Sequence, residues 1–465
     1  MKSSRTTSLT RLLALALGTT ALTGLLAVTP ASADSLTDAL AAAYQTNPTL
    51  QAQRAQLRAT DEGVPQALSG WRPTVQAQGT YGATHTDTTL NTGATAKGDI
   101  EPYTGSVTLS QNVFAGGRTV NATDQAEYGV LAGRESLMSV EQATLFNAVQ
   151  AYMDVIRDQS VVELNRNNVD VLQRQLEATT DRFRVGELTR TDTAQAEARL
   201  SLAKSNLTAA EAQLTASRAF YERVVGQMPG TLERPPVVAG LPETEEDARS
   251  VAEKNNPALQ SARYAEQANR EAISVAKGAL LPTVDIQAQY QYGRDPSLTV
   301  RDVEESSILG VLTIPLYQAG VEYSQVREAK ELHNRSRLQV AAAMREVDEA
   351  VRNAWNQLLS SRASIVSNQE GVNASAIALE GVRQESEVGA RTTLDVLNAE
   401  QEYLNARVSL VSAERDLAVA EYGLLAAMGF LTARNLELPV DYYDPAVNYG
   451  EVRNKWIGFG TAGDE

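Results

Sequence analysis

Hydrophobic and polar positions repeat with two different periods along this chain, and each period is confined to its own stretches. In two stretches, large apolar residues return at every seventh position, with small residues, mostly alanine, between them. This spacing predicts long amphipathic helices that pack against partner helices as coiled coils. Gly226 and Gly429 follow the two stretches, where helix ends are expected. The large residues are Leu200, Leu207, Leu214 and Tyr221 in the first stretch and Tyr403, Leu410, Leu417 and Leu424 in the second.

Two long stretches without proline, residues 103–228 and 316–438, support this prediction. A proline inside a helix costs about 3 kcal/mol, so such stretches favour very long helices. Each stretch is expected to hold a long helix, a turn and a shorter return helix. The expected helices are 117–184 and 190–226 in the first stretch and 319–387 and 392–429 in the second. Two short helices stacked end to end would match one long helix in length if 190–226 is continued by a helix at 247–278, and 392–429 by a helix at 36–69. The segments left over, 227–246 and 430–465, are then expected where the short helices meet.

The second period is two, and it predicts strands at 73–81, 103–114, 282–292 and 307–317. Val284, Ile286 and Ala288, for example, alternate with polar residues. Alternation over about ten residues, with tyrosines near the ends, is typical of lipid-facing barrel strands, although a half-exposed soluble sheet alternates as well. The segments 82–102 and 293–306 are expected to be polar loops.

The number of strands favours the barrel and sets the number of chains. Four strands cannot close a barrel, and an open sheet edge cannot lie in lipid. Two copies would give eight strands, whose interior is filled by side chains, whereas three copies give twelve and leave a lumen. The pattern therefore predicts a trimer.

The whole pattern occurs twice along the chain. Residues 47–51 (NPTLQ) recur as 256–260 (NPALQ), and the PTV at 73–75 recurs at 282–284. The period of about two hundred residues is too long for a solenoid and indicates a duplicated half-molecule. We expect a first structural repeat at 34–228, a linker at 229–246, a second repeat at 247–429 and a C-terminal segment at 430–465.

The first 33 residues have the pattern of a signal peptide. The positively charged Lys2, Arg5 and Arg11 come before an apolar stretch without charge, residues 12–28. Residues 31–33 (ASA) then form a small-residue cleavage site, so cleavage is expected after Ala33. No later run reaches the ~20 apolar residues of a membrane-spanning helix. We therefore expect export, with any membrane crossing made by strands.

Composition narrows the possible functions. A net charge of −16 argues against nucleic acid as a partner. The chain has no cysteine, which excludes disulfides and thiol chemistry, and only His85 and His333 could supply histidine ligands. It also has no phosphate-binding glycine loop and no nucleophile elbow. We predict no enzyme activity, no cofactor and no metal site.

The repeated motifs resemble those of the TolC family of outer-membrane efflux and type I secretion channels. The resemblance rests on the two Asn-Pro motifs, on 109–117 (LSQNVFAGG) and most of all on 388–400 (VGARTTLDVLNAE), and it covers the mature chain in order. It implies a mostly α fold in which each half contributes two strands and long coiled-coil helices. It further implies a homotrimer with a twelve-stranded outer-membrane β-barrel continued by a periplasmic α-helical barrel.

The same resemblance implies partners and site residues. The partners are a periplasmic adaptor (membrane fusion) protein, an inner-membrane transporter driven by ATP (ABC type) or by protons, and outer-membrane lipid. The implied positions are the hairpin tips Val185, Gly186, Val388 and Gly389 for adaptor docking, and Arg391, Thr191, Asp192, Asp395 and Asn398 for a periplasmic gate. Arg391 would link to Thr191 and Asp192, and Asp395 would form an acidic ring. A second acidic ring of the family is lost because its position is Asn398.

The function expected from these observations is a passive exit duct. Two other classes of protein share some of these features. A periplasmic coiled-coil adaptor would have one helical hairpin and no barrel strands. A trimeric surface structural protein, such as an adhesin, would carry its strands at the C-terminus and show no internal duplication.

Overall fold

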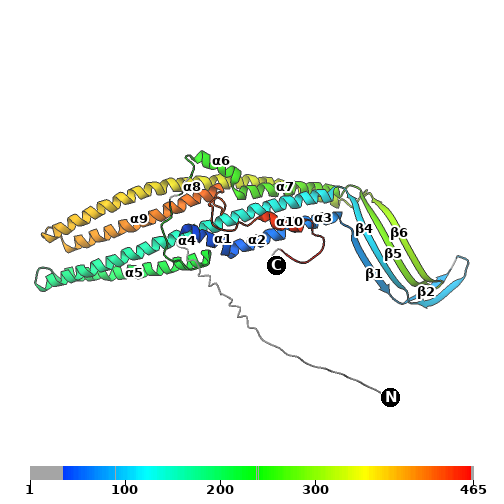
Figure 1. Cartoon of the computed structure of the whole chain (residues 1–465), viewed down its shortest axis with the longest axis horizontal. Coiled ribbons are helices and arrows are strands. Elements are labelled where there is room, and N and C mark those ends of the chain that lie inside the picture. Colours follow the sequence, from blue (N-terminus) through cyan, green and yellow to red (C-terminus); the bar gives the residue numbers. More distant parts are fainter. Residues whose placement is uncertain (1–34, 90, 237, 239, 462–465) are drawn as a thin grey trace, which may run out of the picture.

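This chain forms an elongated molecule whose two ends differ in structure, as a computed structural model of residues 35–89, 91–236, 238 and 240–461 shows (Figure 1). A curved antiparallel sheet forms one end and two helical hairpins form the other. The predicted signal peptide, 1–33, lies outside the described residues. Among the helices of the described part, none is both long enough and apolar enough to span a membrane.

Four strands form the main sheet, antiparallel throughout and in the order β1-β4-β5-β6. They are β1 (Thr74–Tyr81), β4 (Tyr103–Ala115), β5 (Thr283–Ser297) and β6 (Val300–Thr313). The strands predicted at 73–81, 103–114 and 282–292 are confirmed, but the one predicted at 307–317 begins and ends earlier. The reason is that β5 and β6 remain paired up to a tight turn, where Ser297 lies opposite Val300. The predicted loop at 293–306 is therefore mostly strand.

The register of the sheet places an alternating set of mainly apolar residues from all four strands on one face, although Leu309 and Val311 of β6 lie on the other. Leu109 of β4 lies opposite Val75 of β1 and Ala288 of β5, and Ala288 lies opposite Ile308 of β6. Gln287 points to the other face, together with the polar residues that alternate with this set. Side chains directly opposite each other in antiparallel strands share a face. The alternation in the sequence therefore becomes one apolar and one polar face of the sheet.

The polar loop predicted at 82–102 is in fact a second hairpin. Strands β2 (Thr84–Thr89) and β3 (Thr95–Ile100) pair antiparallel in a separate two-stranded sheet. Threonine favours extended backbone, and a hydrogen bond between His85 and Asp99 (2.6 Å) and an ion pair between Asp87 and Lys97 (2.5 Å) join the strands. Most side chains of this hairpin are exposed. No apolar alternation marked its strands in the sequence for that reason.

The long helices have nearly the predicted bounds. Helices α4 (Arg118–Arg184) and α8 (Val321–Glu387) have 67 residues each, and α5 (Arg190–Val225) and α9 (Thr393–Met428) have 36 each. Helix α5 folds back along α4, and α9 along α8 (Figure 1). At 1.5 Å per residue each long helix spans about 100 Å.

The helices predicted at 36–69 and 247–278 are both interrupted at the repeated Asn-Pro motif. The first is divided into α1 (Leu36–Thr46), α2 (Pro48–Asp61), α3 (Gly63–Leu68) and the 3₁₀ turn η1 (Ser69–Trp71), and the second into α6 (Glu245–Asn255) and α7 (Pro257–Gly278). Asn47 and Asn256 have extended backbone, with ψ of 120° and 119°. A residue before proline avoids the helical region, and each asparagine side chain caps the helix that follows. The Asn-Pro repeat is therefore a helix boundary.

The same two asparagines show which short helices meet end to end. Asn47 Nδ2 donates to the carbonyl oxygen of Val224 at the end of α5, and Asn256 Nδ2 to that of Ala427 at the end of α9, both at 3.0 Å. Helix α5 thus ends against the α1–α2 junction of its own half, and α9 against the α6–α7 junction. The predicted continuation of 190–226 by 247–278 and of 392–429 by 36–69 is wrong. The last carbonyl groups of a helix lack donors within the helix, and in each half the asparagine side chain donates a hydrogen bond to one of them.

The main hydrophobic core lies at mid-length, where α1, α4, α5 and the C-terminal segment meet. Tyr152 of α4 and Tyr221 of α5 are fully buried there, and Leu431 and Leu438 of the C-terminal segment complete the cluster. The segment 430–465 was expected to stay at this height, but it continues toward the sheet. Helix α10 (Pro445–Arg453) packs against α2 and α3, and farther on Arg72 Nη1 donates to the carbonyl oxygen of Lys455 at 2.9 Å.

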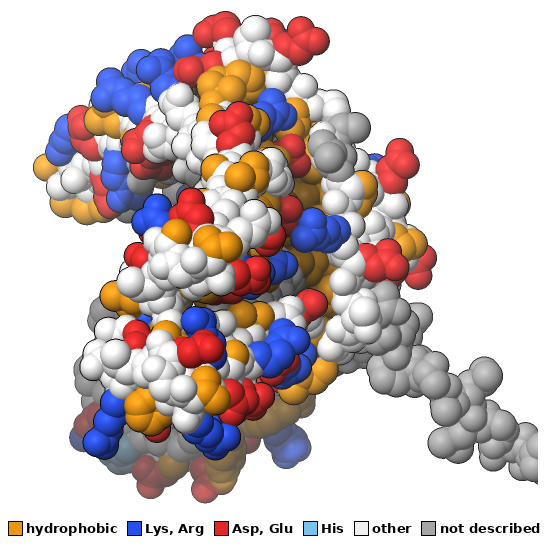
Figure 2. All heavy atoms as spheres, turned by 90° about the vertical axis from the view of Figure 1, so that its left-hand side faces the viewer, with side chains coloured by type: hydrophobic (Ala, Val, Ile, Leu, Met, Phe, Trp, Pro, Cys, Tyr) orange, Lys and Arg blue, Asp and Glu red, His pale blue; other side chains and the backbone are white. Residues whose placement is uncertain are grey.

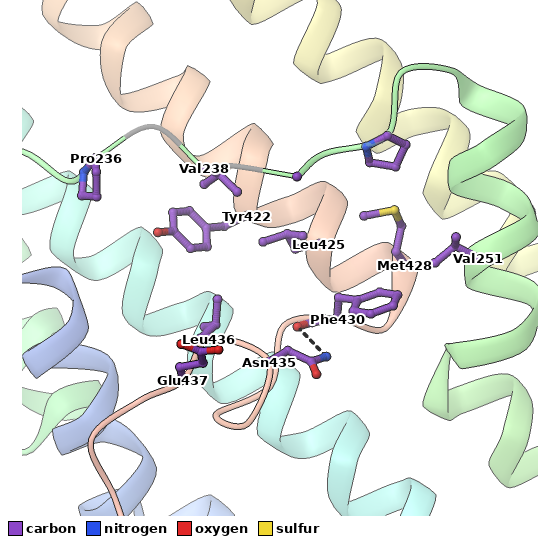
Figure 3. Close-up of a pocket in the computed structure, with 12 residues that line it drawn as sticks. Pro236, Val238, Val251, Tyr422, Leu425, Met428, Phe430, Asn435, Leu436 and Glu437 are labelled. Atoms are coloured by element: carbon purple, nitrogen blue, oxygen red, sulfur yellow. Dashed lines mark hydrogen bonds between the residues drawn. The ribbon is translucent and has the colours of Figure 1, made fainter.

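The linker between the two halves crosses the molecule at the same height. It lies beside the end of α9 and leaves an open cavity of about 510 Å³ (Figure 3). The walls are mainly apolar, and they include Pro236 and Val238 of the linker and Tyr422 and Met428 of α9. This cavity marks the place where the chain passes from the first half to α6.

Candidate functional site

The candidate site lies at the hairpin ends farthest from the sheet, where the sequence predicted tips and a gate. The turns follow α4 and α8, and Gly186 and Gly389 take the left-handed conformation in them, each with φ of 80°. Val185 and Val388, directly before these glycines, are 73% and 81% exposed. Each tip therefore presents an apolar side chain to solvent, and the two tips repeat the same structure.

Both return helices begin with a capping box. In α9, Asp395 Oδ2 accepts hydrogen bonds from the backbone nitrogen of Thr392 at 2.9 Å and from its Oγ1 at 2.8 Å. In α5, Asp192 Oδ2 makes the same two bonds with Thr189, at 2.9 and 2.7 Å. These bonds lower the pKa of both carboxyl groups, for Asp395 through the backbone bond first and for Asp192 through the side-chain bond first. Two predicted gate residues thus hold the start of their own helices.

Arg391 contacts its own hairpin in a single chain. Its Nε donates to Glu385 Oε2 of α8 at 2.7 Å, and the side chains of both residues are about half exposed. The links predicted from Arg391 to Thr191 and Asp192 are not present within one chain. An exposed pair of this kind contributes little to stability and leaves the arginine free to exchange partners.

A different contact joins the two hairpins at this end. Arg199 Nη2 of α5 donates to Asn398 Oδ1 of α9 at 2.7 Å. Next to it, Leu397 of α9 is 1% exposed and packs in a cluster with Leu172 of α4 and Leu200 of α5. The sequence placed Asn398 among the predicted gate positions, as the place of a lost acidic ring. It missed Arg199, because no local pattern relates two residues so far apart in the chain.

A second polar network joins the hairpins nearer mid-length. Asp158 is 4% exposed and binds Ser217 of α5 and Arg157, whose Nε donates to it at 2.8 Å. Arg415 Nε of α9 donates to Asp154 Oδ1 at 2.9 Å, and Arg157 also pairs with Asp154. The hydrogen bond to Asp158 raises the pKa of Arg157. This network connects α4, α5 and α9 through paired charges, and it joins the two hairpins at a point nearer mid-length than the predicted gate residues.

The outer surface at this end is densely charged. Figure 2 views the molecule from the end with the hairpin tips and shows acidic and basic side chains interspersed over this end face. The outline of the end face is concave on one side. In the part of the chain that the structure describes, no three His, Asp or Glu side chains are grouped as a metal site. The polar contacts found at this end include hydrogen bonds and ion pairs between side chains.

Comparison with known proteins gives this arrangement a family context. The family model described as outer membrane efflux protein matches residues 39–227 and 248–430. The chain is 37% identical over 450 residues to the outer membrane efflux protein BepC of Brucella suis, covering 96% of each chain. It is 25% identical over 413 residues to the outer membrane protein TolC of Vibrio cholerae, covering 87% of this chain and 92% of that protein. The CmeC outer membrane channel of Campylobacter jejuni has the same fold, with a TM-score of 0.75 and 15% identity over 90% of this chain and 89% of CmeC.

Proposed function

This chain belongs to the outer membrane efflux protein family, and on that premise we propose that three copies assemble into one continuous exit duct. It is an outer-membrane duct for efflux or secretion. In the proposed assembly, three four-stranded sheets close a twelve-stranded barrel in the outer membrane, and the helices continue it as a tube through the periplasm. The duct is passive and has no catalytic role, so its partners supply the energy.

One observation carries the proposal, namely the four-stranded sheet with an apolar face and two open edges. Within the described residues, β1 pairs only with β4, and β6 only with β5. Ile308 and Val75 on the apolar face are 80% and 65% exposed. In water such a face and such edges favour aggregation, whereas lipid and neighbouring copies would cover them. Pairing β6 of one copy with β1 of the next removes every edge.

The helices support the same assembly. Helix α8 leaves large apolar side chains exposed along its length in the single chain, as a helix does when it packs against a neighbour in the assembly. They include Leu332, Leu338, Leu359, Val366 and Ile377. The concave outline of the end face suits one segment of a tube wall (Figure 2).

The proposed partners follow from the two ends of the duct. The exposed tips at Val185–Gly186 and Val388–Gly389 would receive a periplasmic adaptor, which connects the duct to an inner-membrane transporter. Arg391 would leave Glu385 and link to Thr191 or Asp192 when copies assemble, and Asp395 would face the constriction. Cleavage of the signal peptide after Ala33 would precede assembly.

The test compares a lysine on each face of the same strand. Ile308 lies on the apolar face and its neighbour Leu309 on the polar face, opposite Gln287. A lysine on the lipid side of a barrel costs about 2–4 kcal/mol near the middle of the membrane, whereas the lumen side tolerates it. We expect Ile308→Lys to abolish outer-membrane insertion and conductance in planar bilayers, and Leu309→Lys to retain both.

Equal behaviour of the two lysine variants would contradict a lipid-facing sheet and favour a soluble protein. A wild-type protein that inserts but never conducts would contradict the duct itself.

A further inference from the structure

The two hairpins of one chain meet near their tips through a contact between α5 and α9. Arg199 projects from α5, two turns after the capping box, and its Nη2 donates to Asn398 Oδ1 at 2.7 Å. An arginine donor makes a stronger hydrogen bond than a neutral donor, and an amide acceptor leaves the bond easier to break than a salt bridge. The contact is therefore directional and reversible.

A hydrophobic contact lies directly beside this bond. Leu397, the residue before Asn398, is 1% exposed, although it belongs to the second hairpin and its neighbours to the first. Leu172 of α4 and Leu200 and Ala203 of α5 surround it, and each is at most 5% exposed. Separating the hairpins would expose Leu397 to water, so this contact resists separation as well.

Four other charged residues at this end have partners within their own hairpins. Arg391 binds Glu385, Asp192 and Asp395 cap their own helices, and Arg383 of α8 binds Glu400 of α9. None of these contacts opposes a movement of one hairpin away from the other. The contact of Arg199 with Asn398 does, because its partners lie on different hairpins.

We propose that Arg199, Asn398 and Leu397 form a latch that holds the two hairpins of each chain together and keeps the duct closed. This inference rests on the function proposed above and names the residues that set the resting state. Asn398 then acts through α5 and not through ions in the lumen. Opening requires the hydrogen bond to break and Leu397 to leave its cluster, which a partner that draws α9 away from α5 would achieve.

The central test converts the hydrogen bond into a salt bridge. With Asn398→Asp, the new carboxylate faces the Arg199 guanidinium, and we expect the closed-to-open ratio in single-channel recordings to rise about tenfold. Arg199→Gln and Leu397→Ala are expected to lower this ratio, and Arg199→Gln should cancel the gain from Asn398→Asp. These effects appear in the resting state, without any partner protein.

Asn405 provides a matched control for the added charge. It lies one heptad after Asn398 on α9, and its Oδ1 accepts a hydrogen bond from Gln401 of the same helix at 2.9 Å. Asn405→Asp adds the same charge without a partner on α5, so it should leave the closed-to-open ratio unchanged. The latch is refuted if both aspartate variants have the same closed-to-open ratio. It is also refuted if the only effect of Asn398→Asp is stronger block by divalent cations, and this block is the same when Arg199→Gln is present.

A second measurement does not depend on conductance. The chain has no cysteine, so Arg199→Cys combined with Asn398→Cys places the only two thiols at the latch. A short bis-maleimide should link them within one chain in intact cells. Failure to link, with both thiols reactive, overturns the latch even if the duct conducts. A link in a protein that never conducts would instead retain the latch and overturn the duct.

Discussion

Asn47 is expected to hold together the junction of α1, α2 and α5, and its replacement tests how the helices are joined. Its Oδ1 accepts from the backbone nitrogens of Thr49 and Leu50 at 3.0 and 3.4 Å, while its Nδ2 donates to the carbonyl oxygen of Val224 at 3.0 Å. The residue is 9% exposed, so water cannot readily replace these partners. Asn47→Ala removes both the cap and the cross-link.

The two losses can be estimated separately. Replacing an N-cap asparagine by alanine costs about 1 kcal/mol. The lost hydrogen bond to Val224 adds about 1 kcal/mol. A sum of about 2 kcal/mol corresponds to about 30-fold easier local opening. Asn47→Ser keeps a cap acceptor but cannot reach Val224, so it should cost only about 1 kcal/mol, or about fivefold.

Hydrogen exchange measured by mass spectrometry reports this opening without requiring reversible unfolding. Peptides that contain the backbone amides of Thr49 and Leu50 should exchange fastest in Asn47→Ala, more slowly in Asn47→Ser and slowest in the wild type. Asn256→Ala should repeat the result at the start of α7, because Asn256 makes the equivalent bonds. Equal rates in the alanine and serine variants would refute the capping argument.

Three further predictions concern backbone strain and buried or exposed charge. Gly429 and Gly226 both have φ of 89°, so replacement by alanine costs about 1–2 kcal/mol of backbone strain at each position. At Gly429 the new Cβ would also collide with the rigid backbone oxygen of Asn255, whereas at Gly226 it would meet only the side chain of Thr46. Gly429→Ala should therefore melt at a lower temperature than Gly226→Ala, and the reverse order would contradict the argument. The pKa of Asp395 is lowered in the folded chain, so its charged carboxylate stabilises α9 at pH values above the unfolded pKa of about 3.9. This stabilisation is lost as pH falls through the folded pKa, so exchange protection at the start of α9 should be flat from pH 5 to 8 and fall only below about pH 4. Asp395→Asn should remove this pH-dependent step. Burial raises the pKa of Asp61, which penalises its charged form as pH rises, so Asp61→Asn should melt no lower than the wild type at pH 7, and a markedly lower melting temperature would refute this.

The sequence predicted those features that depend on periodicity. Leu200 and its heptad partners marked the long helices, and Val284 and its neighbours marked a strand whose apolar residues lie on one face of the sheet. Such features are encoded locally, because a helix or strand must present one face to its neighbours. The sequence also predicted the duplication, and in both halves the structure repeats two strands of the main sheet, a long helix and a shorter return helix.

Features that depend on pairing between distant residues were missed or misread. The Asn-Pro motif at Asn47 indicated the repeat and the family resemblance, but no helix end was predicted there, although a residue before proline favours a helix boundary. Helix lengths did not show which short helix meets the end of α5 in space, because the two candidates, 36–69 and 247–278, are similar in length. Hairpin β2–β3 has no apolar face, and the contact of Arg199 with Asn398 joins residues with no common sequence signal.

The mass and shape of the detergent-extracted protein test the central claim most directly. The chain of 465 residues has a mass of 50.0 kDa, and light scattering gives the number of chains in a particle. We predict three chains in a rod longer than about 100 Å by negative-stain microscopy, because each long helix alone spans that length. A monomer or a compact globule would contradict the trimeric duct, since four strands with two open edges cannot form a membrane pore alone.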